Sequence, residues 1–268
     1  MKQVDALSWV KMNVFHWHIT DSQSWSLEIK KHPRMTNDAY SPREIYTQKD
    51  IQALVRYGRE RRVRVIPEIA LPGHSASGWL QVDKQAVACA QSCLINDVYY
   101  EVANLFMDNI PMLARMNSRP IASTTLPLPW ISSTSVLALP IYMDKPERRI
   151  MIWEDIVLSH DIPAKSLSSS VILQSWNDGT HNIKKLAQKG YDIVVSSADF
   201  SIWTAVMVVV VGYDFTNGLT DEEAKHILGA EAAVWSEQTD VLSVESKVWP
   251  RTAALVWKSQ QGRMEAYN

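Results

Sequence analysis

Residues 13–25, NVFHWHITDSQSW, begin as an apolar β-strand and end in a cluster of two histidines, two tryptophans and an aspartate. The strand that we expect over 12–19 is followed by a helix over 47–62 and by a second strand over 63–69. Thr47 stands at the expected N-cap of the helix, whose apolar residues recur on one face and whose end is basic. This strand–helix–strand order, with polar residues just after the strands, predicts a parallel sheet that carries a site at the carboxyl ends of its strands.

The same alternation continues along the chain. Further strands are expected over 149–156, 171–176, 191–197 and 232–237, and further helices over 97–109, 182–190, 220–230 and 249–258. Thr220 and Glu223 form a predicted capping box, Gly229 stands at the end of that helix, and Pro250 falls in the first turn of the last helix. Apolar strands that alternate with helices predict the α/β class, and 268 residues suit one (β/α)8 barrel.

Composition excludes several classes of protein. The net charge of −2 gives no basic field for binding nucleic acid. The longest apolar run, AVMVVVV at 205–211, is far shorter than the roughly 18 residues of a membrane-spanning helix. The two cysteines, Cys89 and Cys93, are too few for a disulfide framework and have no metal-ligand histidines at a familiar spacing. We therefore expect a globular protein that neither binds nucleic acid nor spans a membrane.

Eleven tryptophans suggest which kind of ligand is bound. Trp153, Trp176 and Trp235 each stand at or near the end of an apolar run. An indole is the best side chain for stacking on the flat C–H face of a sugar ring. These residues therefore indicate a carbohydrate pocket, and the alternative is that they pack in the core.

Two stretches interrupt the pattern. Residues 110–140 are rich in proline, serine and threonine and show no period, which is unusual inside a compact domain. Residues 201–211, SIWTAVMVVVV, are apolar without alternation. A long surface loop and a buried strand are the simplest interpretations of these two segments.

The chain resembles the catalytic domain of glycoside hydrolase family 20, and most of all its fungal β-N-acetylhexosaminidases. The resemblance rests on KMNVFHWHITDSQSWSLE, YTQKDIQALVRYGRERRVRVIPEIALPGH, WEDI, LQSWN, GLTDEEAKHILGAEAAVWSEQTD and WPRTAAL, which follow one another in the order of the family. It implies a (β/α)8 barrel over 1–268 that lacks its first strand and a small N-terminal α+β domain. It also implies that the site needs no cofactor or metal, that a homodimer is possible, and that the protein is secreted or vacuolar/lysosomal.

The activity that the resemblance implies is removal of terminal, non-reducing β-linked N-acetylglucosamine or N-acetylgalactosamine. The mechanism is substrate-assisted, because the acetamido oxygen of the substrate attacks the anomeric carbon in place of an enzyme carboxylate. An Asp orients the acetamide, and the adjacent Glu protonates the leaving oxygen and then activates water.

Site residues carry over by position. Asp21 and His74 resemble the pair that supports the catalytic carboxylates, and the alternative for each is a loop residue that caps a turn. Trp153, Trp176 and Trp235 resemble the pocket walls, and Glu237 resembles the carboxylate that accepts hydrogen bonds from sugar hydroxyls. Glu68 is expected to be structural. Ala70 stands where the family usually has Asp, so one supporting carboxylate is missing.

The Asp-Glu pair itself is absent from the place where the family has His-x-Gly-(Gly/Ala)-Asp-Glu. Back-translation of 109–117, read from the third base of each codon, permits Tyr-Ser/Thr-His-Val-Gly-Ala-Asp-Glu, and the codons of Met116 and Asn117 force the final Glu. The same frame over 201–208 permits Tyr-Leu-Asp-Cys-Gly-His-Gly, in which the codons of Trp203 and Thr204 force the Asp. Two motifs recovered in one frame at the two expected places predict frameshifts under the interrupted segments.

Two functions follow from these observations. The first is a β-N-acetylhexosaminidase whose gene product carries the Asp-Glu pair. The second is a catalytically dead sugar-binding pseudoenzyme or pseudogene fragment, which is what the chain as written predicts. A third class, a metal-dependent barrel such as a sugar isomerase, would need strand-end ligands drawn from His18, Asp21, Glu68 and His74, and would leave the rest of the resemblance unexplained.

Overall fold

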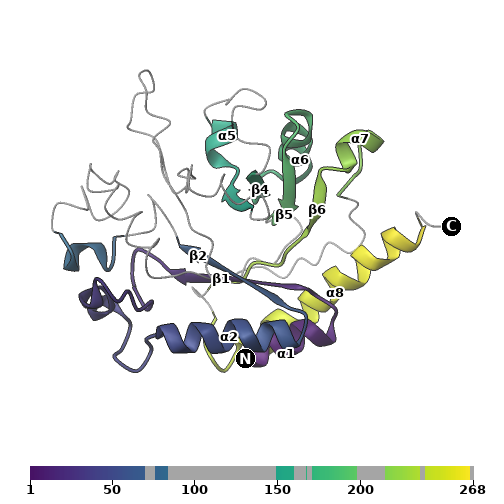
Figure 1. Ribbon diagram of the computed structural model, residues 1–268. Coiled ribbons are helices and arrows are strands. Elements are labelled where there is room, and N and C mark those ends of the chain that lie inside the picture. The colour runs from purple at the N-terminus through teal and green to yellow at the C-terminus, as the bar shows by residue number, and fades with distance from the viewer. Residues whose placement is uncertain are drawn as a thin grey trace, which may run out of the picture. The chain divides into compact units, whose positions relative to one another are not determined.

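The computed structural model describes residues 1–69, 76–83, 149–159, 167, 171–197, 215–235 and 239–265 (Figure 1). The chain divides into two compact units, which are described separately: Met1–Ser8 with Asn13–Ile150, and Trp9–Met12 with Met151–Asn268. The helix expected over 97–109, both interrupted segments, His74 and Glu237 lie outside the described residues.

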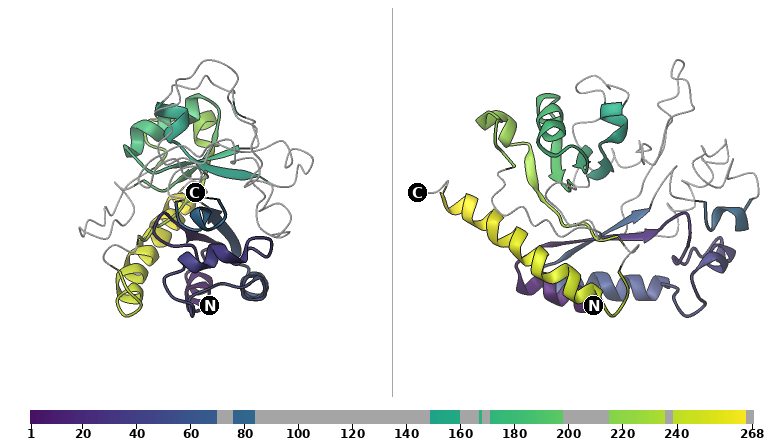
Figure 2. Two further views of the ribbon diagram at one scale, coloured as in Figure 1. Left: turned by 90° about the vertical axis from the view of Figure 1, so that its left-hand side faces the viewer. Right: turned by 180° about the vertical axis from the view of Figure 1, so that it is seen from behind.

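The first unit is built on one parallel strand pair. The strands β1 (Val14–Thr20) and β2 (Arg64–Ile69) pair in parallel from Val14 opposite Arg64 to His18 opposite Glu68. The helix α2 (Gln48–Glu60) connects them and lies along one side of the pair in both views of Figure 2. The remaining elements are the helix α1 (Lys2–Trp9) and two 3₁₀ turns, η1 (Pro33–Asp38) and η2 (Trp79–Gln81). Both strands and the helix between them confirm the sequence prediction.

Helix α2 begins where its sequence specifies. The Thr47 hydroxyl accepts a hydrogen bond from the Asp50 N–H at 3.2 Å, and the Asp50 carboxylate accepts one from the Thr47 N–H at 3.0 Å. These reciprocal bonds form a capping box, which satisfies two backbone donors that the first turn of a helix leaves free. The N-cap at Thr47 is therefore confirmed, with Asp50 as its partner.

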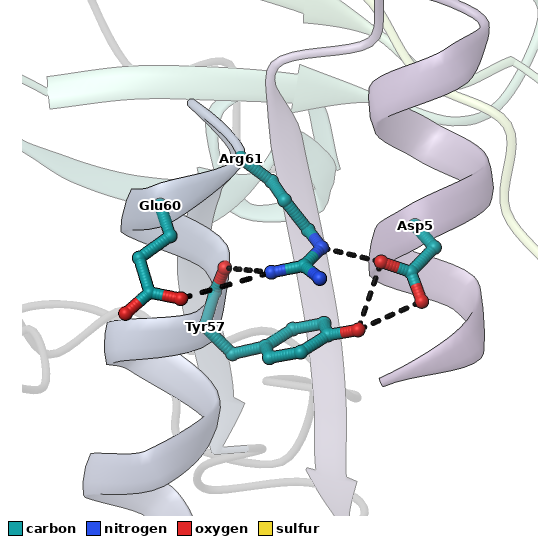
Figure 3. Close-up of polar contacts among 4 residues, drawn as sticks. All are labelled: Asp5, Tyr57, Glu60 and Arg61. Carbon is teal, nitrogen blue, oxygen red and sulfur yellow. Dashed lines mark hydrogen bonds and ion pairs between the residues drawn. The ribbon is translucent and has the colours of Figure 1, made fainter.

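Side chains of α1 and α2 meet in a polar cluster (Figure 3). The Tyr57 hydroxyl is 2.9 and 2.8 Å from the two Asp5 carboxylate oxygens, and the Arg61 guanidinium donates to the same carboxylate. Arg61 also lies 3.4 Å from the centre of the Tyr57 ring. The hydrogen bonds from Tyr57 and then from Arg61 lower the pKa of Asp5, and the bond to Asp5 raises the pKa of Tyr57.

Two buried indoles form the centre of the apolar core beside η2. Trp25 and Trp79 are 0% and 1% exposed, and their rings meet edge to face with centroids 5.2 Å apart. Gly78 has a φ of +77°, and a Cβ at this position would lie 2.7 Å from the Trp25 ring. Only glycine fits here, because both the backbone conformation and the ring exclude a side chain.

The second unit contains a four-stranded sheet with strands in chain order: β3 (Ile150–Trp153), β4 (Val171–Ser175), β5 (Asp192–Val195) and β6 (Ile227–Ala230). The pairs β4–β5 and β5–β6 are parallel. Three helices connect the strands: α5 (Asp155–Ser159), α6 (Gly179–Gln188) and α7 (Asp221–Ala224). The helix α8 (Val244–Glu265) follows the sheet. Figure 1 shows α6 beside β4 and β5.

Three boundaries predicted in this unit are wrong. The strand expected over 149–156 ends at Trp153, and α5 begins at Asp155. Helix α6 begins at Gly179, before the predicted 182. Helix α8 begins at Val244, so that Pro250 lies inside the helix and not in its first turn. The Asp240 carboxylate accepts hydrogen bonds from the Leu242 and Ser243 N–H groups, which starts the chain turning before α8.

The largest error concerns residues 220–237. The capping box of Thr220 and Glu223 is present, but α7 ends at Ala224 and residues 227–230 form β6. Residues 232–235 of the strand expected over 232–237 are not in a strand. Pairing with β5 places Ile227 opposite Ile193 and Gly229 opposite Val194. A four-residue helix has few internal hydrogen bonds, so ladder bonds to a buried strand decide the conformation of these residues.

Both sheets confirm the predicted α/β class. In the residues that the structure describes, the strands form one sheet of two and one of four strands, and no closed barrel is seen among them.

Candidate active site

The carboxyl edge of the four-stranded sheet gathers polar side chains from neighbouring strands. The Glu154 N–H donates to the Gln174 carbonyl at 3.0 Å, the Ser196 N–H to Ser175 at 2.7 Å, and the Glu231 N–H to Val195 at 2.8 Å. The Gln174 side-chain amide also donates to the Glu231 carboxylate across β5. This edge is where the sequence predicts a site, because parallel strands end together there.

Trp176 directly follows β4 at this edge and is half-buried. Its indole N–H donates to the Asp155 carboxylate at 2.9 Å, and its backbone N–H donates to Glu154 at 3.2 Å. Both polar hydrogens of the residue are therefore bonded to consecutive carboxylates at the start of α5. This arrangement fixes the ring relative to the sheet.

Trp153 and Trp235 are the other two predicted wall residues. Trp153 is the last residue of β3, next to β4, and is half-buried. Trp235 lies five residues beyond the end of β6 and is also half-buried. None of the three predicted walls is fully enclosed in the way that Trp25 and Trp79 are. Their role against a sugar stays a prediction.

Glu154 was not predicted as a site residue, although it is the most enclosed carboxylate of the edge. It is 2% exposed, and its oxygens accept hydrogen bonds from the Ser175 hydroxyl at 2.7 Å and the Asn177 N–H at 2.8 Å. The Trp176 N–H and the Asn182 amide, each at 3.2 Å, complete its set of donors. Burial raises the pKa of Glu154, although these hydrogen bonds favour the charged form. An acidic residue directly after a strand-end tryptophan, in WEDI, is the signal that could have identified it.

The strands β1 and β2 and the turn after β1 carry a second polar group, in the first unit. His16 Nε2 lies 3.1 Å from a Glu68 carboxylate oxygen, and these side chains are 15% and 14% exposed. His18 Nε2 lies 3.7 Å from an Asp21 carboxylate oxygen. Asp21 also accepts the Ser22 N–H at 2.5 Å and so shapes its own turn. The structure thus brings His18 and Asp21 together. The hydrogen bond from the Ser22 N–H also fits the alternative that Asp21 caps its own turn.

Metal-ligand groups and membrane-spanning helices can be assessed only in the part of the chain that the structure describes. No group of three or more His, Cys, Asp or Glu side chains there could hold a metal ion. Among the helices described, none has the length and apolar character needed to cross a membrane.

Comparison with known proteins identifies the family. The chain matches the family described as "Glycosyl hydrolase family 20, catalytic domain" over residues 1–117 and 132–259. It is 34% identical to Beta-hexosaminidase 1 of Coccidioides posadasii, a match that covers 98% of this chain and 58% of that protein. It is 29% identical to the chitooligosaccharidolytic beta-N-acetylglucosaminidase of Bombyx mori, over 94% of this chain and 53% of that protein. The chain thus spans little more than half the length of these relatives.

Solved structures agree in fold. The chitobiase of Flavobacterium johnsoniae superposes with a TM-score of 0.71 at 25% identity, covering 96% of this chain and 45% of that one. An exo beta-N-acetylglucosaminidase from Vibrio harveyi superposes with a TM-score of 0.69 at 18% identity, covering 95% of this chain and 50% of that one. The family match covers the ends of the strands in both units. The chain therefore belongs to glycosyl hydrolase family 20.

Proposed function

We propose that the chain is the catalytic part of a β-N-acetylhexosaminidase that removes terminal, non-reducing β-linked N-acetylglucosamine or N-acetylgalactosamine. The observation that carries the proposal is the family match over 1–117 and 132–259, which includes the strand-end residues of both units. The named relatives are a beta-hexosaminidase and a chitooligosaccharidolytic beta-N-acetylglucosaminidase. The corresponding fold is a (β/α)8 barrel, and the corresponding location is outside the cell or in a vacuolar or lysosomal compartment.

The proposed chemistry is substrate-assisted hydrolysis with retention of configuration. The acetamido oxygen of the substrate attacks the anomeric carbon, and the glycosidic oxygen leaves with a proton from a glutamic acid. Trp153, Trp176 and Trp235 wall the pocket and hold the acetamide under the sugar ring. Glu237 accepts hydrogen bonds from sugar hydroxyls, and Asp21 and His74 support the catalytic carboxylates.

The catalytic carboxylates are the Asp-Glu pair of the alternative frame beneath 109–117. The same frame beneath 201–208 supplies the Tyr and Asp that grip the acetamide. Under this proposal, the interrupted segments at 110–140 and 201–211 are products of frameshifts and not an evolved loop and strand.

A non-catalytic sugar-binding protein is the second candidate. One specific observation favours it: the chain as written has no Asp-Glu pair within 110–117. Loss of a general acid alone slows a reaction by roughly 10²–10⁴-fold. A chain translated in the written frame would retain tryptophans for stacking and lose turnover.

Two chains test these candidates together. One is the chain as written, and the other has the alternative frame restored at 109–117 and 201–208. Both are assayed with p-nitrophenyl N-acetyl-β-glucosaminide and the galactosaminide, while the messenger is sequenced across codons 105–215. We expect turnover from the restored chain only. Turnover by the written chain would contradict the frameshift, and a folded restored chain without turnover would contradict the enzyme.

A further inference from the structure

Glu154 and Asp155, between β3 and α5, accept several hydrogen bonds from the residues at the end of β4. Glu154 stands between Trp153 and α5, and its carboxylate accepts hydrogen bonds from three consecutive residues, Ser175, Trp176 and Asn177. Asn182 of α6 donates to the same carboxylate at 3.2 Å and to the Asn177 carbonyl at 2.8 Å. One buried side chain therefore fixes the backbone of the segment where β4 ends.

Stability alone does not favour a carboxylate at this position. Removing a charged group from water is costly, and the burial of Glu154 raises its pKa in spite of four hydrogen bonds. A side chain that is unfavourable to bury, and that gathers several donors from one short segment, serves to hold that segment in one conformation.

The neighbouring residue completes the arrangement. Asp155 is half-buried and accepts the Trp176 indole N–H at 2.9 Å. Glu154 therefore fixes the main chain of Trp176, and Asp155 fixes its ring. A tryptophan bonded at both polar hydrogens has little rotamer freedom left, and it stays half-exposed at the carboxyl edge of the sheet.

We propose that Glu154 and Asp155 are positioning residues that hold Trp176 as a preformed stacking platform for an N-acetylhexosamine ring. This inference rests on the proposed function, since that function supplies the sugar. A ring held in place before binding loses less conformational entropy when the sugar arrives, and so binds it more tightly. Glu154 acts through the Ser175 hydroxyl and the backbone N–H groups of Trp176 and Asn177, and Asp155 acts through the indole.

The first measurement follows the ring itself. In the full chain with ¹⁵N-labelled tryptophan, the Trp176 indole N–H signal is assigned by its loss in Trp176→Phe. We expect Asp155→Ala to speed exchange of this proton with solvent by about tenfold, since it loses one hydrogen bond. Asp155→Asn keeps an acceptor oxygen and restores slow exchange. The matched control is Asp192→Ala, which removes a carboxylate bonded to His226 at 3.0 Å and lies at the opposite edge of the same sheet.

The second measurement follows the sugar. N-acetylglucosamine is titrated calorimetrically into the same variants, and we expect Asp155→Ala to weaken its affinity by about three- to tenfold. Glu154→Gln should bind like the wild type, because its amide oxygen accepts the three N–H donors and its NH₂ donates to the Ser175 hydroxyl. Glu154→Met removes every acceptor and should weaken binding at least as much as Asp155→Ala.

The outcomes separate the two proposals. If wild type binds the sugar and Asp155→Ala changes neither exchange nor affinity, or if Asp192→Ala weakens binding equally, the positioning role is wrong. If the indole responds as expected but neither the written nor the frame-restored chain binds N-acetylglucosamine, the sugar-binding function is wrong and the fixing of Trp176 stands. Because Asp155 is half-buried, its variants keep the test decisive even if Glu154→Met does not fold.

Discussion

The two units each depend on a hydrogen-bonded carboxylate, but the two groups are set in opposite surroundings. Asp5 of the first unit joins two helices at the surface, and its hydrogen bonds to Tyr57 and Arg61 lower its pKa. Glu154 of the second unit joins two strand ends in the interior, and burial raises its pKa. Hydrogen bonds outweigh desolvation for Asp5, whereas desolvation outweighs four hydrogen bonds for Glu154. The number of hydrogen bonds that a carboxylate accepts therefore does not alone decide the sign of its pKa shift.

The largest effect in this comparison is expected for Glu154→Met, which removes the buried acceptor of the second unit. The substitution keeps the volume but leaves the N–H groups of Trp176, Asn177 and Asn182 without their acceptor. Each buried donor left unsatisfied costs about 1–3 kcal/mol, so we expect the free energy of unfolding to fall by about 3–5 kcal/mol. Urea unfolding followed by circular dichroism measures this, with Glu154→Gln as the control. A loss below about 1 kcal/mol for Met would show that water or movement satisfies the donors.

Gly78→Ala tests how rigidly Trp25 is packed in the first unit. Gly218→Ala in the second unit is the matched control. Both glycines have a φ near +77°, but a Cβ at Gly78 meets the Trp25 ring at 2.7 Å whereas one at Gly218 meets nothing within 4 Å. We expect thermal unfolding to show a loss of about 2–4 kcal/mol for Gly78→Ala and about 1 kcal/mol for Gly218→Ala. Equal losses would mean that Trp25 moves aside freely.

The two capping boxes allow a finer comparison between the units. Thr47 caps the 13-residue α2, and Thr220 caps the four-residue α7. Replacing an N-cap threonine with alanine costs typically about 1 kcal/mol. We expect that value for Thr47→Ala and less than about half of it for Thr220→Ala, because so short a helix contributes little that a cap can protect. Urea midpoints of both variants measure the difference, and a larger effect at Thr220 would contradict it.

The smallest expected effect is the acid dependence of stability due to Asp5. Its folded pKa lies below the ordinary 3.8, so its stabilisation is present at neutral pH and is lost as the pH falls from about 4 through the folded pKa. The variant Asp5→Asn should flatten the acid side of a stability profile measured by urea unfolding from pH 2 to 7. Glu154→Gln should change the profile in the opposite direction. Because the folded pKa of Glu154 is raised, the wild type loses stability as the pH rises from about 4.5 through that folded pKa, and the variant lacks this loss. If the stability profiles of Asp5→Asn and wild type ran parallel, Asp5 would contribute nothing to the acid dependence of stability.

Local signals in the sequence predicted part of this structure well. The start of α2 is encoded within four residues, Thr47 to Asp50, and its period shows in the sequence, so both were predicted. The end of α7 is not encoded locally. Ile227 to Ala230 form a strand and do not extend the helix, because they pair with β5, which is distant in the sequence. Pro250 misled for a related reason, since turn-forming bonds at Asp240 start α8 earlier than the proline suggests.

The candidate site divides in the same way. The positions of Asp21, Trp153 and Trp176 at or near the ends of apolar runs were predicted from the sequence. WEDI marks Glu154 as an acidic residue after a strand, but the sequence does not show which groups it binds. Its four donors come from residues 21 to 28 positions away, and the pairing of β3 with β4 brings them within reach.

The capping box of α2 also bears on the order in which the first unit folds. Parallel strands need the chain between them to be in place before they pair, and β1 and β2 are separated by 43 residues, 21 to 63. The start signal of α2 needs only residues 47–50, which are synthesised before any residue of β2. We therefore expect the first turn of α2 to form during synthesis and to shorten the search that β2 makes for β1.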